Sequence, residues 1–153
     1  MLNKFREKLI PITTVIGNNF GSLGLSPTFW SMIAFAFAIL SSIFFGITNF
    51  LNEQGIDFPS QIFASIMLLL SGFFDIVDGS VARVTKRSTT KGAFLDSNFD
   101  KISEALIFIG IAIGGLSNPV LAMIALSSSI LVSYLRARSE SLGIEGCRNR
   151  RES

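Results

Sequence analysis

The chain has 153 residues, of which 49% are hydrophobic and 16% are charged, and its formal net charge is +2. A charge this small, without repeats that interleave aromatic and basic residues, excludes a nucleic-acid-binding protein. The lack of histidine and the single cysteine exclude zinc sites and Cys–His catalysis. Any metal must therefore be bound by oxygen atoms, and a carboxylate is the expected general base.

The N-terminal segment, residues 1–20, differs from a signal peptide. Its charged residues precede only a short apolar run, and no small-residue cleavage site follows. Leu2, Phe5 and Leu9 share one face at helical spacing, and the charged residues lie on the other face. This pattern predicts an amphipathic helix that lies on the membrane surface.

Four apolar segments follow and indicate an integral membrane protein. The first, residues 29–50, has no charged residue and is long enough to cross a hydrocarbon core of roughly 30 Å as a helix. The second begins at Pro59, and its helix is expected to continue to about Arg83. The third covers residues 92–116, with charges only in its first half, and the fourth covers residues 119–135. We therefore predict an all-α membrane protein with four transmembrane helices.

The connections between these helices alternate in their content of lysine and arginine. Basic residues occur in the N-terminal segment, in residues 83–91 and in the C-terminal tail, whereas residues 52–58 and 114–118 contain none. Cytoplasmic loops carry the excess of basic residues, so both termini are expected in the cytoplasm. The chain is then a multi-pass protein of the cytoplasmic membrane.

Four aspartates form the most informative group in the sequence. Asp75 and Asp78 are three residues apart and share one face near the end of the second helix. Asp96 and Asp100 are four residues apart and share one face at the start of the third. A short basic connection makes these helices antiparallel neighbours. All four carboxylates are therefore expected at the same depth, on the cytoplasmic side.

Carboxylates this close together repel one another, and ionised groups near hydrocarbon are costly. A divalent cation would remove both penalties, and ligation by oxygen atoms alone suits Mg²⁺ or Mn²⁺. Gly79 and Ala82 leave room for a ligand beside the metal, and Arg83 is placed to bind a phosphate. The alternative is that the aspartates only cap helices and pair with nearby basic residues. The glycine and arginine at fixed positions among them disfavour it.

Residues 75–100 follow the pattern Asp-x2-Asp-Gly-x2-Ala-Arg-x8-Gly-x3-Asp-x3-Asp. This pattern resembles the complete signature of the CDP-alcohol phosphotransferase family. The resemblance implies a membrane transferase of phospholipid biosynthesis, with Asp100 as the base that deprotonates the acceptor hydroxyl. The implied ligands of a two-metal site, with Mg²⁺ or Mn²⁺, are Asp75, Asp78, Asp96 and Asp100.

The resemblance also implies a nucleotide site. Residues 24–28 and Ser31 resemble the start of the family's first transmembrane helix, where the nucleotide is approached, although Thr28 replaces the common Asn or Asp. The residues expected to contact the CDP group are Gly79, Ala82, Arg83, Thr89, Thr28 and Ser31.

Residues 133–143 resemble the end of the fourth transmembrane helix in phosphatidylinositol phosphate and archaetidylinositol phosphate synthases. In that branch basic residues bind the acceptor phosphate, a role implied here for Ser133, Arg136 and Arg138. The two arginines also fit ordinary positive-inside anchors. The implied reaction transfers a phosphatidyl or archaetidyl group from CDP-diacylglycerol or CDP-archaeol to inositol 1-phosphate and releases CMP. Glycerol 3-phosphate is the main competing acceptor, and a homodimer is expected.

Family members usually have six transmembrane helices, whereas this sequence supports four. The resemblance assigns residues 1–146 to the membrane domain and residues 147–153 to a polar tail, so the last two helices of the family are expected to be missing. A non-catalytic membrane subunit is therefore an alternative. A cation transporter is another, but it requires carboxylates at mid-membrane depth.

Two weaker signals lie in the third and fourth helices. Glu104, one turn beyond Asp100, either supports the metal site from outside or pairs with Lys101. Residues 127–129 are expected to be close-packing contacts between helices.

Overall fold

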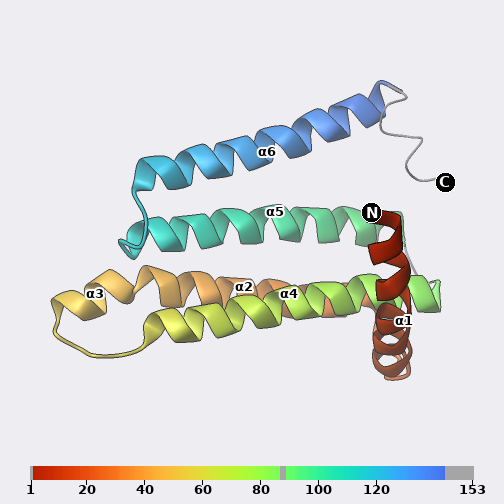
Figure 1. Ribbon diagram of the computed structural model, residues 1–153, viewed down its shortest axis with the longest axis horizontal. Coiled ribbons are helices and arrows are strands. Elements are labelled where there is room, and N and C mark those ends of the chain that lie inside the picture. Colours follow the sequence, from red (N-terminus) through yellow and green to blue (C-terminus); the bar gives the residue numbers. More distant parts are fainter. Residues whose placement is uncertain (1, 87–88, 144–153) are drawn as a thin grey trace.

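The protein is all α-helical, and no strand occurs within residues 2–86 and 89–143, which the computed structural model describes (Figure 1). The side chains of residues 2–10 and 12 lie outside the described part, and with them the apolar face predicted from Leu2, Phe5 and Leu9. The predicted polar tail, residues 147–153, also lies outside it. The helices are α1 (Leu2–Gly21), α2 (Pro27–Gly46), α3 (Thr48–Glu53), α4 (Ser60–Thr85), α5 (Thr90–Ile113) and α6 (Pro119–Ser141).

Capping residues and prolines in the sequence explain where the helices begin and end. Ser26 caps α2 by accepting a hydrogen bond from a first-turn amide at 3.3 Å, and Pro27 follows, where a missing N–H is tolerated. Asn118 and Pro119 begin α6 in the same way, and the Asn118 side-chain oxygen accepts a hydrogen bond from the Val120 amide at 2.9 Å. Lys86 adopts a left-handed conformation, with φ of 52°, and ends α4.

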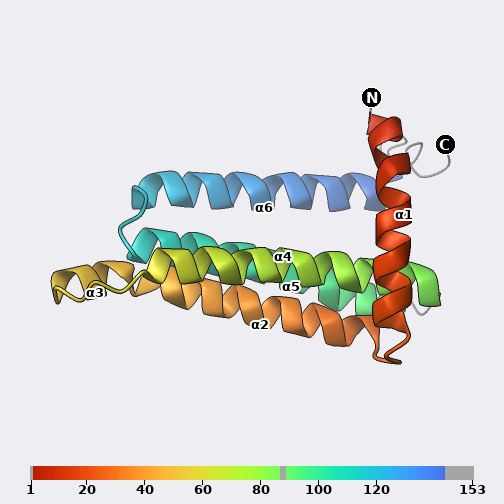
Figure 2. The ribbon, with the colours of Figure 1, turned by 60° about the horizontal axis from the view of Figure 1, so that its bottom comes forward.

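Most helices run along a common axis, and α1 crosses them at one end (Figures 1 and 2). α2 packs on both α4 and α5, α1 packs on α4, and α6 packs on α5. The end that α1 crosses is the one where α2 begins, α4 ends and α5 begins (Figure 1). The four aspartates of the signature therefore lie toward this end of the bundle.

Small residues allow α2 and α4 to approach closely. Ala38 and Ala64 are fully buried between them. The Ser41 hydroxyl donates to the Ala64 carbonyl at 2.8 Å, and the Ser71 hydroxyl donates to the Ala34 carbonyl at 2.9 Å. These polar side chains are satisfied inside the bundle, as the interior of a membrane requires. They also fix α4, and with it two of the aspartates, against α2.

Aromatic side chains hold α1 on the bundle. Phe20 of α1 packs edge-on against Trp30 of α2, with ring centroids 5.1 Å apart, and Trp30 stacks on Phe74 of α4 at 5.9 Å. Gly17 lets α1 touch α4, because a Cβ at this position would lie 2.7 Å from the Ser80 carbonyl oxygen. α1 thus covers the half of α4 that carries the aspartates.

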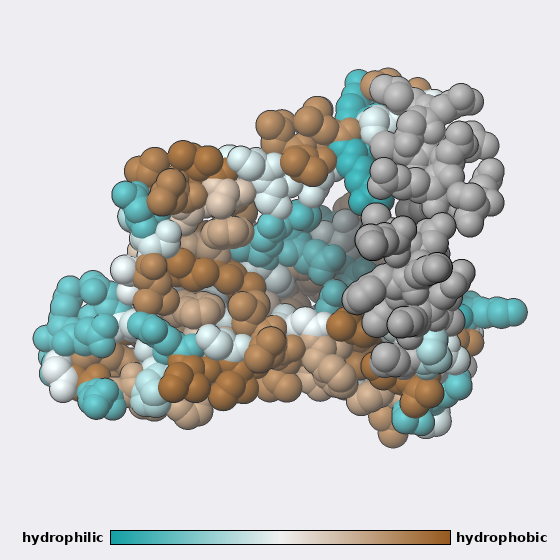
Figure 3. Space-filling model, in the orientation of Figure 1, coloured by the Kyte–Doolittle hydropathy of each residue, from teal (hydrophilic) through white to brown (hydrophobic). Residues whose placement is uncertain are grey.

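Three helical stretches are long and apolar enough to cross a membrane: residues 27–53, 60–85 and 119–141. Their outward faces carry exposed apolar side chains, such as Leu69 at 75% and Met123 at 67% exposure. Apolar surface also dominates much of the face in Figure 3. Exposed apolar area on this scale is typical of helices that face lipid.

Charged residues interrupt the first half of α5. The charged residues are Lys91, Asp96, Asp100, Lys101 and Glu104. Because of them, α5 is not among the three stretches that are apolar enough to cross a membrane by length and composition. The helices expected from the sequence are confirmed, whereas four transmembrane crossings and two cytoplasmic termini stay predictions.

Candidate active site

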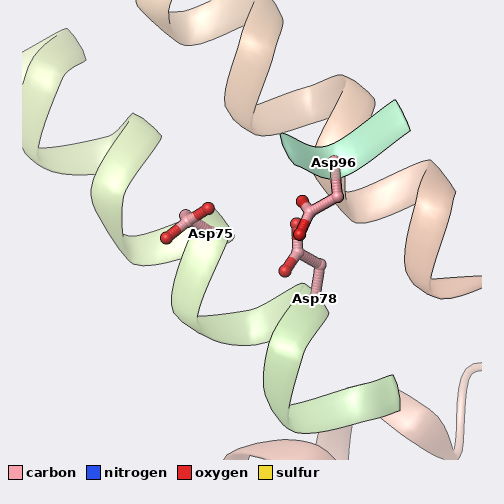
Figure 4. A group of neighbouring side chains, drawn as sticks. All are labelled: Asp75, Asp78 and Asp96. Carbon is pink, nitrogen blue, oxygen red and sulfur yellow. The ribbon is translucent and has the colours of Figure 1, made fainter. Parts of the chain in front are cut away.

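Three of the predicted metal ligands come together between α4 and α5. Asp75 and Asp78 extend from α4 and Asp96 extends from α5 (Figure 4). One carboxylate oxygen from each lies within 4.8 Å of the others. Spacing on α4 and the packing of both helices on α2 produce this arrangement. The three carboxylates are therefore close enough for one cation to contact all of them.

Asp78 shows most directly that the group fits a cation. Its side chain is 4% exposed, and its Oδ2 atom has no hydrogen-bond partner among the described residues. Buried polar atoms are normally hydrogen-bonded, and a buried charge is stable only when paired. The ion pairs Lys101–Glu104 and Arg136–Glu140 include none of the four aspartates. A hard divalent cation would supply the missing partner.

Asp100, the predicted base, lies beside this group and not within it. It shares a cavity of about 400 Å³ with Asp75, Asp78 and Asp96, and its side chain is exposed. The structure thus brings all four aspartates to one cavity, with Asp75, Asp78 and Asp96 close together.

A second, smaller pocket lies against the same carboxylates. It has a volume of about 120 Å³ and shares Ser31, Asp78 and Asp96 with the larger cavity. Its other lining residues are Pro27, Thr28, Gly79, Ala82, Thr89, Gly92 and Ala93. Five of the six predicted nucleotide contacts thus line this one pocket; the sixth is Arg83.

Local hydrogen bonds give this pocket its shape. Thr89 caps α5, and its hydroxyl accepts from the Gly92 amide at 3.0 Å. A Cβ on Gly92 would lie 3.0 Å from the Thr89 hydroxyl oxygen and 3.3 Å from that of Thr28. Glycine at this position therefore lets both hydroxyls border the pocket.

Arg83 lies outside the pocket lining. Its Nε atom donates to the Gly79 carbonyl one turn earlier at 2.8 Å, and the side chain is exposed. This bond leaves the terminal nitrogens of Arg83 on the side of Gly79, since an added Cβ at Gly79 would lie 3.8 Å from one of them. A nucleotide phosphate in the pocket would be close to this guanidinium.

The predicted acceptor residues lie apart from the two pockets. Ser133 is half-buried on α6, whereas Arg136 and Arg138 are exposed. Arg136 pairs with Glu140 on its own helix at 3.5 Å. None of the three lines either aspartate-containing pocket.

Sequence reasoning missed several lining residues. Gly92 and Ala93 line the smaller pocket, and Ser71, Gly72 and Phe99 line the larger one. Gly92 is a fixed position of the signature, so its place in the motif is a signal for a site role. The other residues occupy no fixed position of the signature, and only the packing of α2, α4 and α5 shows that they line the pockets.

Comparison with known proteins identifies the family of this chain. Residues 24–143 match the family described as CDP-alcohol phosphatidyltransferase. The chain belongs to the CDP-alcohol phosphatidyltransferase family. The matched region contains every residue of both pockets, so the family assignment and the site geometry concern the same part of the chain.

Individual relatives fall in one branch of this family. An archaetidylinositol phosphate synthase of Pyrococcus horikoshii is 37% identical over 143 residues, which cover 94% of this chain and 70% of that protein. A protein of the same name from Methanothermobacter thermautotrophicus is 49% identical over 86 residues, or 56% of this chain and 44% of the relative. A phosphatidylinositol phosphate synthase of Streptomyces avermitilis is 42% identical over 86 residues, which cover 52% and 35% of the two chains.

Proposed function

We propose that the protein is a metal-dependent membrane enzyme of phospholipid synthesis. It transfers a phosphatidyl or archaetidyl group from a CDP-linked lipid to inositol 1-phosphate and releases CMP. The observation that carries the proposal is the position of the aspartates, which lie between a small pocket lined by hydroxyl groups and glycines and a larger cavity that runs along three helices.

The two cavities suit the two parts of such a reaction. The smaller pocket offers the hydroxyls of Thr28, Ser31 and Thr89 to the polar groups of a nucleotide, and Gly79 and Gly92 leave it room. The larger cavity is lined partly by apolar residues, including Leu68 and Phe108, which suit the lipid side of the donor. A pyrophosphate between the two cavities would lie against the carboxylates.

The proposed reaction breaks the bond between the two phosphate groups of the CDP-linked lipid. The acceptor's hydroxyl oxygen attacks the phosphorus that carries the lipid, and CMP leaves with the electron pair of the broken bond. The hydroxyl proton passes to a carboxylate oxygen of Asp100, which lines the larger cavity. Bases held on a helix beside the substrate gain from proximity and orientation.

The four aspartates would hold the required Mg²⁺ or Mn²⁺. The cluster of Asp75, Asp78 and Asp96 and the orphaned Oδ2 atom of Asp78 support this assignment. When bound, two divalent cations neutralise charge on the pyrophosphate and on the departing CMP. Asp100 is adjacent in the same cavity and completes the ligand set.

The names of the relatives support inositol 1-phosphate as the acceptor. The Pyrococcus protein is named as an archaetidylinositol phosphate synthase and the Streptomyces protein as a phosphatidylinositol phosphate synthase. We assign binding of the acceptor phosphate to Ser133, Arg136 and Arg138 on α6. Glycerol 3-phosphate, which also presents a hydroxyl and a phosphate, is the acceptor to test against it.

The proposed topology has four crossings by α2, α4, α5 and α6, with both termini and the aspartates on the cytoplasmic side. The apolar stretches and the charge asymmetry of the connections support it. Residues 1–146 form the membrane domain, and two copies are proposed to form a homodimer.

A product assay tests the proposal. Purified protein in lipid nanodiscs is given CDP-archaeol or CDP-diacylglycerol, with inositol 1-phosphate, glycerol 3-phosphate or inositol as acceptor, and CMP and lipid product are measured. We expect product with inositol 1-phosphate and Mg²⁺ or Mn²⁺, and none with a chelator. Asp100→Asn should lower activity at least about 100-fold, because the base is lost while the side-chain shape is kept.

A matched control guards against a general effect of removing a carboxylate. Asp57 is exposed in the connection between α3 and α4, away from both pockets. Asp57→Asn should retain activity. Product formation that survives chelation or Asp100→Asn would refute the mechanism. If CMP is released with glycerol 3-phosphate and not with inositol 1-phosphate, the proposed acceptor is wrong but the proposed reaction type stands.

A further inference from the structure

Glu104 joins α5 to α6 through a serine on the facing helix. Its Oε1 atom accepts a hydrogen bond from the Ser129 hydroxyl, and its Oε2 atom accepts one from the Lys101 ammonium at 2.7 Å. Both carboxylate oxygens therefore have partners. Glu104 lies one helical turn beyond Asp100. A charged side chain within a membrane-spanning segment has a large desolvation cost, which indicates that Glu104 has a specific role.

The Glu104–Ser129 contact lies at a defined point of an antiparallel helix pair. The connection between α5 and α6, residues 114–118, is short. Nearer to that connection, Phe108 and Ala112 of α5 share a small apolar pocket with Ala122 and Leu126 of α6. These pairs and the Glu104–Ser129 contact agree with one helix register, because antiparallel neighbours advance in opposite directions by equal rises.

This register brings the acceptor residues level with the aspartates. One turn from Glu104 toward the start of α5 is Asp100, and one turn from Ser129 toward the end of α6 is Ser133. Two turns from Ser129 is Arg136, at the level of the first turns of α5. A hydrogen bond at Glu104 therefore fixes which part of α6 lies across from the proposed base.

Exposure along α6 supports a common face for these groups. Ser129 and Ser133 are half-buried, whereas the neighbouring Ser128 is exposed. The spacing of 129, 133 and 136 places them on one side of a helix. The Ser128 hydroxyl donates instead to the Ile124 carbonyl of its own helix at 2.7 Å.

α5 and α6 are not parallel along their length (Figure 1). In Figure 1 the two helices diverge toward the C-terminal end of α6, and in Figure 3 hydrophilic surface lies in the hollow between them. Ala122, near the start of α6, is its buried residue among those described, so apolar packing on α5 is concentrated at that end of the helix. The position of Ser133 and Arg136 relative to the aspartates thus depends strongly on the contact at Glu104.

We propose that Glu104 is a positioning residue for acceptor binding. Through Ser129 it sets the register and separation of α6, so that Ser133 and Arg136 face an acceptor phosphate across from Asp100. Lys101 holds the Glu104 carboxylate in the orientation that Ser129 needs. The inference rests on the proposed function, since it concerns the acceptor of that reaction, and it assigns Glu104 no direct contact with substrate.

Steady-state kinetics in nanodiscs test the role of the contact. Ser129→Ala should raise the KM for inositol 1-phosphate about 3- to 10-fold, the range expected for loss of one hydrogen bond, with the KM for the CDP-linked lipid within about 2-fold of wild type. Ser129→Thr keeps the hydroxyl and should restore the acceptor KM. Ser128→Ala, which removes a bond within α6 alone, should match wild type.

Substitutions of Glu104 separate positioning from chemistry. Glu104→Ala should raise the acceptor KM as Ser129→Ala does, and the double variant should be no worse than Glu104→Ala alone, because both remove the same contact. Glu104→Gln keeps an oxygen that accepts from Ser129 and should retain most of the acceptor affinity. A kcat at least about 100-fold lower in Glu104→Gln, with an unchanged acceptor KM, would overturn the proposal.

A distance measurement tests the contact independently of activity. Cys147 is replaced by serine, and spin labels are attached to cysteines at the exposed positions Phe94 on α5 and Tyr134 on α6. Ser129→Ala should broaden or shift the distance distribution, and Ser128→Ala should leave it unchanged. Equal distributions in both variants would overturn the positioning role even if the protein released no CMP, so this result and failure of the proposed function can be told apart.

Discussion

At the scale of single residues, Asp78 combines burial with an unmet need for a partner. It is 4% exposed, its Oδ2 atom has no hydrogen-bond partner among the described residues, and the carboxylates of Asp75 and Asp96 lie nearby. In the absence of a cation, such a group destabilises the folded chain, because an unpaired buried charge loses its hydration. A bound cation reverses the sign of this contribution.

Asp78→Asn should therefore have opposite effects on stability with and without metal. Without metal, the Asp78→Asn variant should melt at the same temperature as the wild-type protein or at a higher one, because a charge has been removed from a buried site. Free Mn²⁺ at one hundred times its Kd should stabilise wild type by about 2.7 kcal/mol and the variant by much less. Thermal unfolding with and without Mn²⁺, together with Mn²⁺ binding by electron paramagnetic resonance, checks this. Equal stabilisation of both proteins would rule out Asp78 as a ligand.

At the scale of helices, local signals in the sequence predicted most of the fold. Pro27 and Pro119 begin α2 and α6. The third of the predicted transmembrane helices, α5, begins at Thr90, two residues before its predicted start. α6 continues to Ser141, beyond the predicted end at residue 135, because hydropathy marks the part suited to lipid and the polar residues that follow still form a helix.

The candidate site divides in the same way into predictable and unpredictable parts. The grouping of the four aspartates followed from helical spacing, and five residues that the family resemblance predicts as nucleotide contacts line the adjoining pocket. The Glu104–Ser129 contact was not predictable, since it depends on the register between two helices, and the periodicity of each helix alone leaves that register open. The same holds for Phe99 and Gly72, which gain their place from packing.

The contact between α1 and α4 provides a test at this scale. Gly17→Ala should lower thermal stability by about 1–3 kcal/mol, because its Cβ would meet the Ser80 carbonyl oxygen at 2.7 Å, and a backbone atom cannot turn aside. Gly21→Ala is the matched control on the same helix. Its Cβ would lie 3.3 Å from a methyl group of Thr85, which can move. Melting curves in detergent compare the two, and equal stability would mean that α1 packs loosely on α4.

At the scale of the whole molecule, the proposed function requires polar chemistry within an apolar helical bundle. Apolar side chains cover the outside of the bundle, while the aspartates lie between α4 and α5 and toward the end that α1 crosses. α5 carries charges in its first half, and Asp96, Asp100, Lys101 and Glu104 among them line the larger cavity, whereas Lys91 lies in the exposed first turn. A helix of this kind can cross a membrane, since its charged groups face protein and not lipid.

Whether α5 crosses can be decided by labelling the connections. In a chain with Cys147 replaced by serine, single cysteines are placed at Asp57, Lys86 and Ser117 and treated with a membrane-impermeant maleimide on intact cells. If all four helices cross, cysteines at positions 57 and 117 react from outside, and that at position 86 reacts only after permeabilisation, because the basic connection is cytoplasmic. If α5 lay along the surface, position 117 would behave like position 86. The reactivity at 117 alone therefore separates four crossings from three.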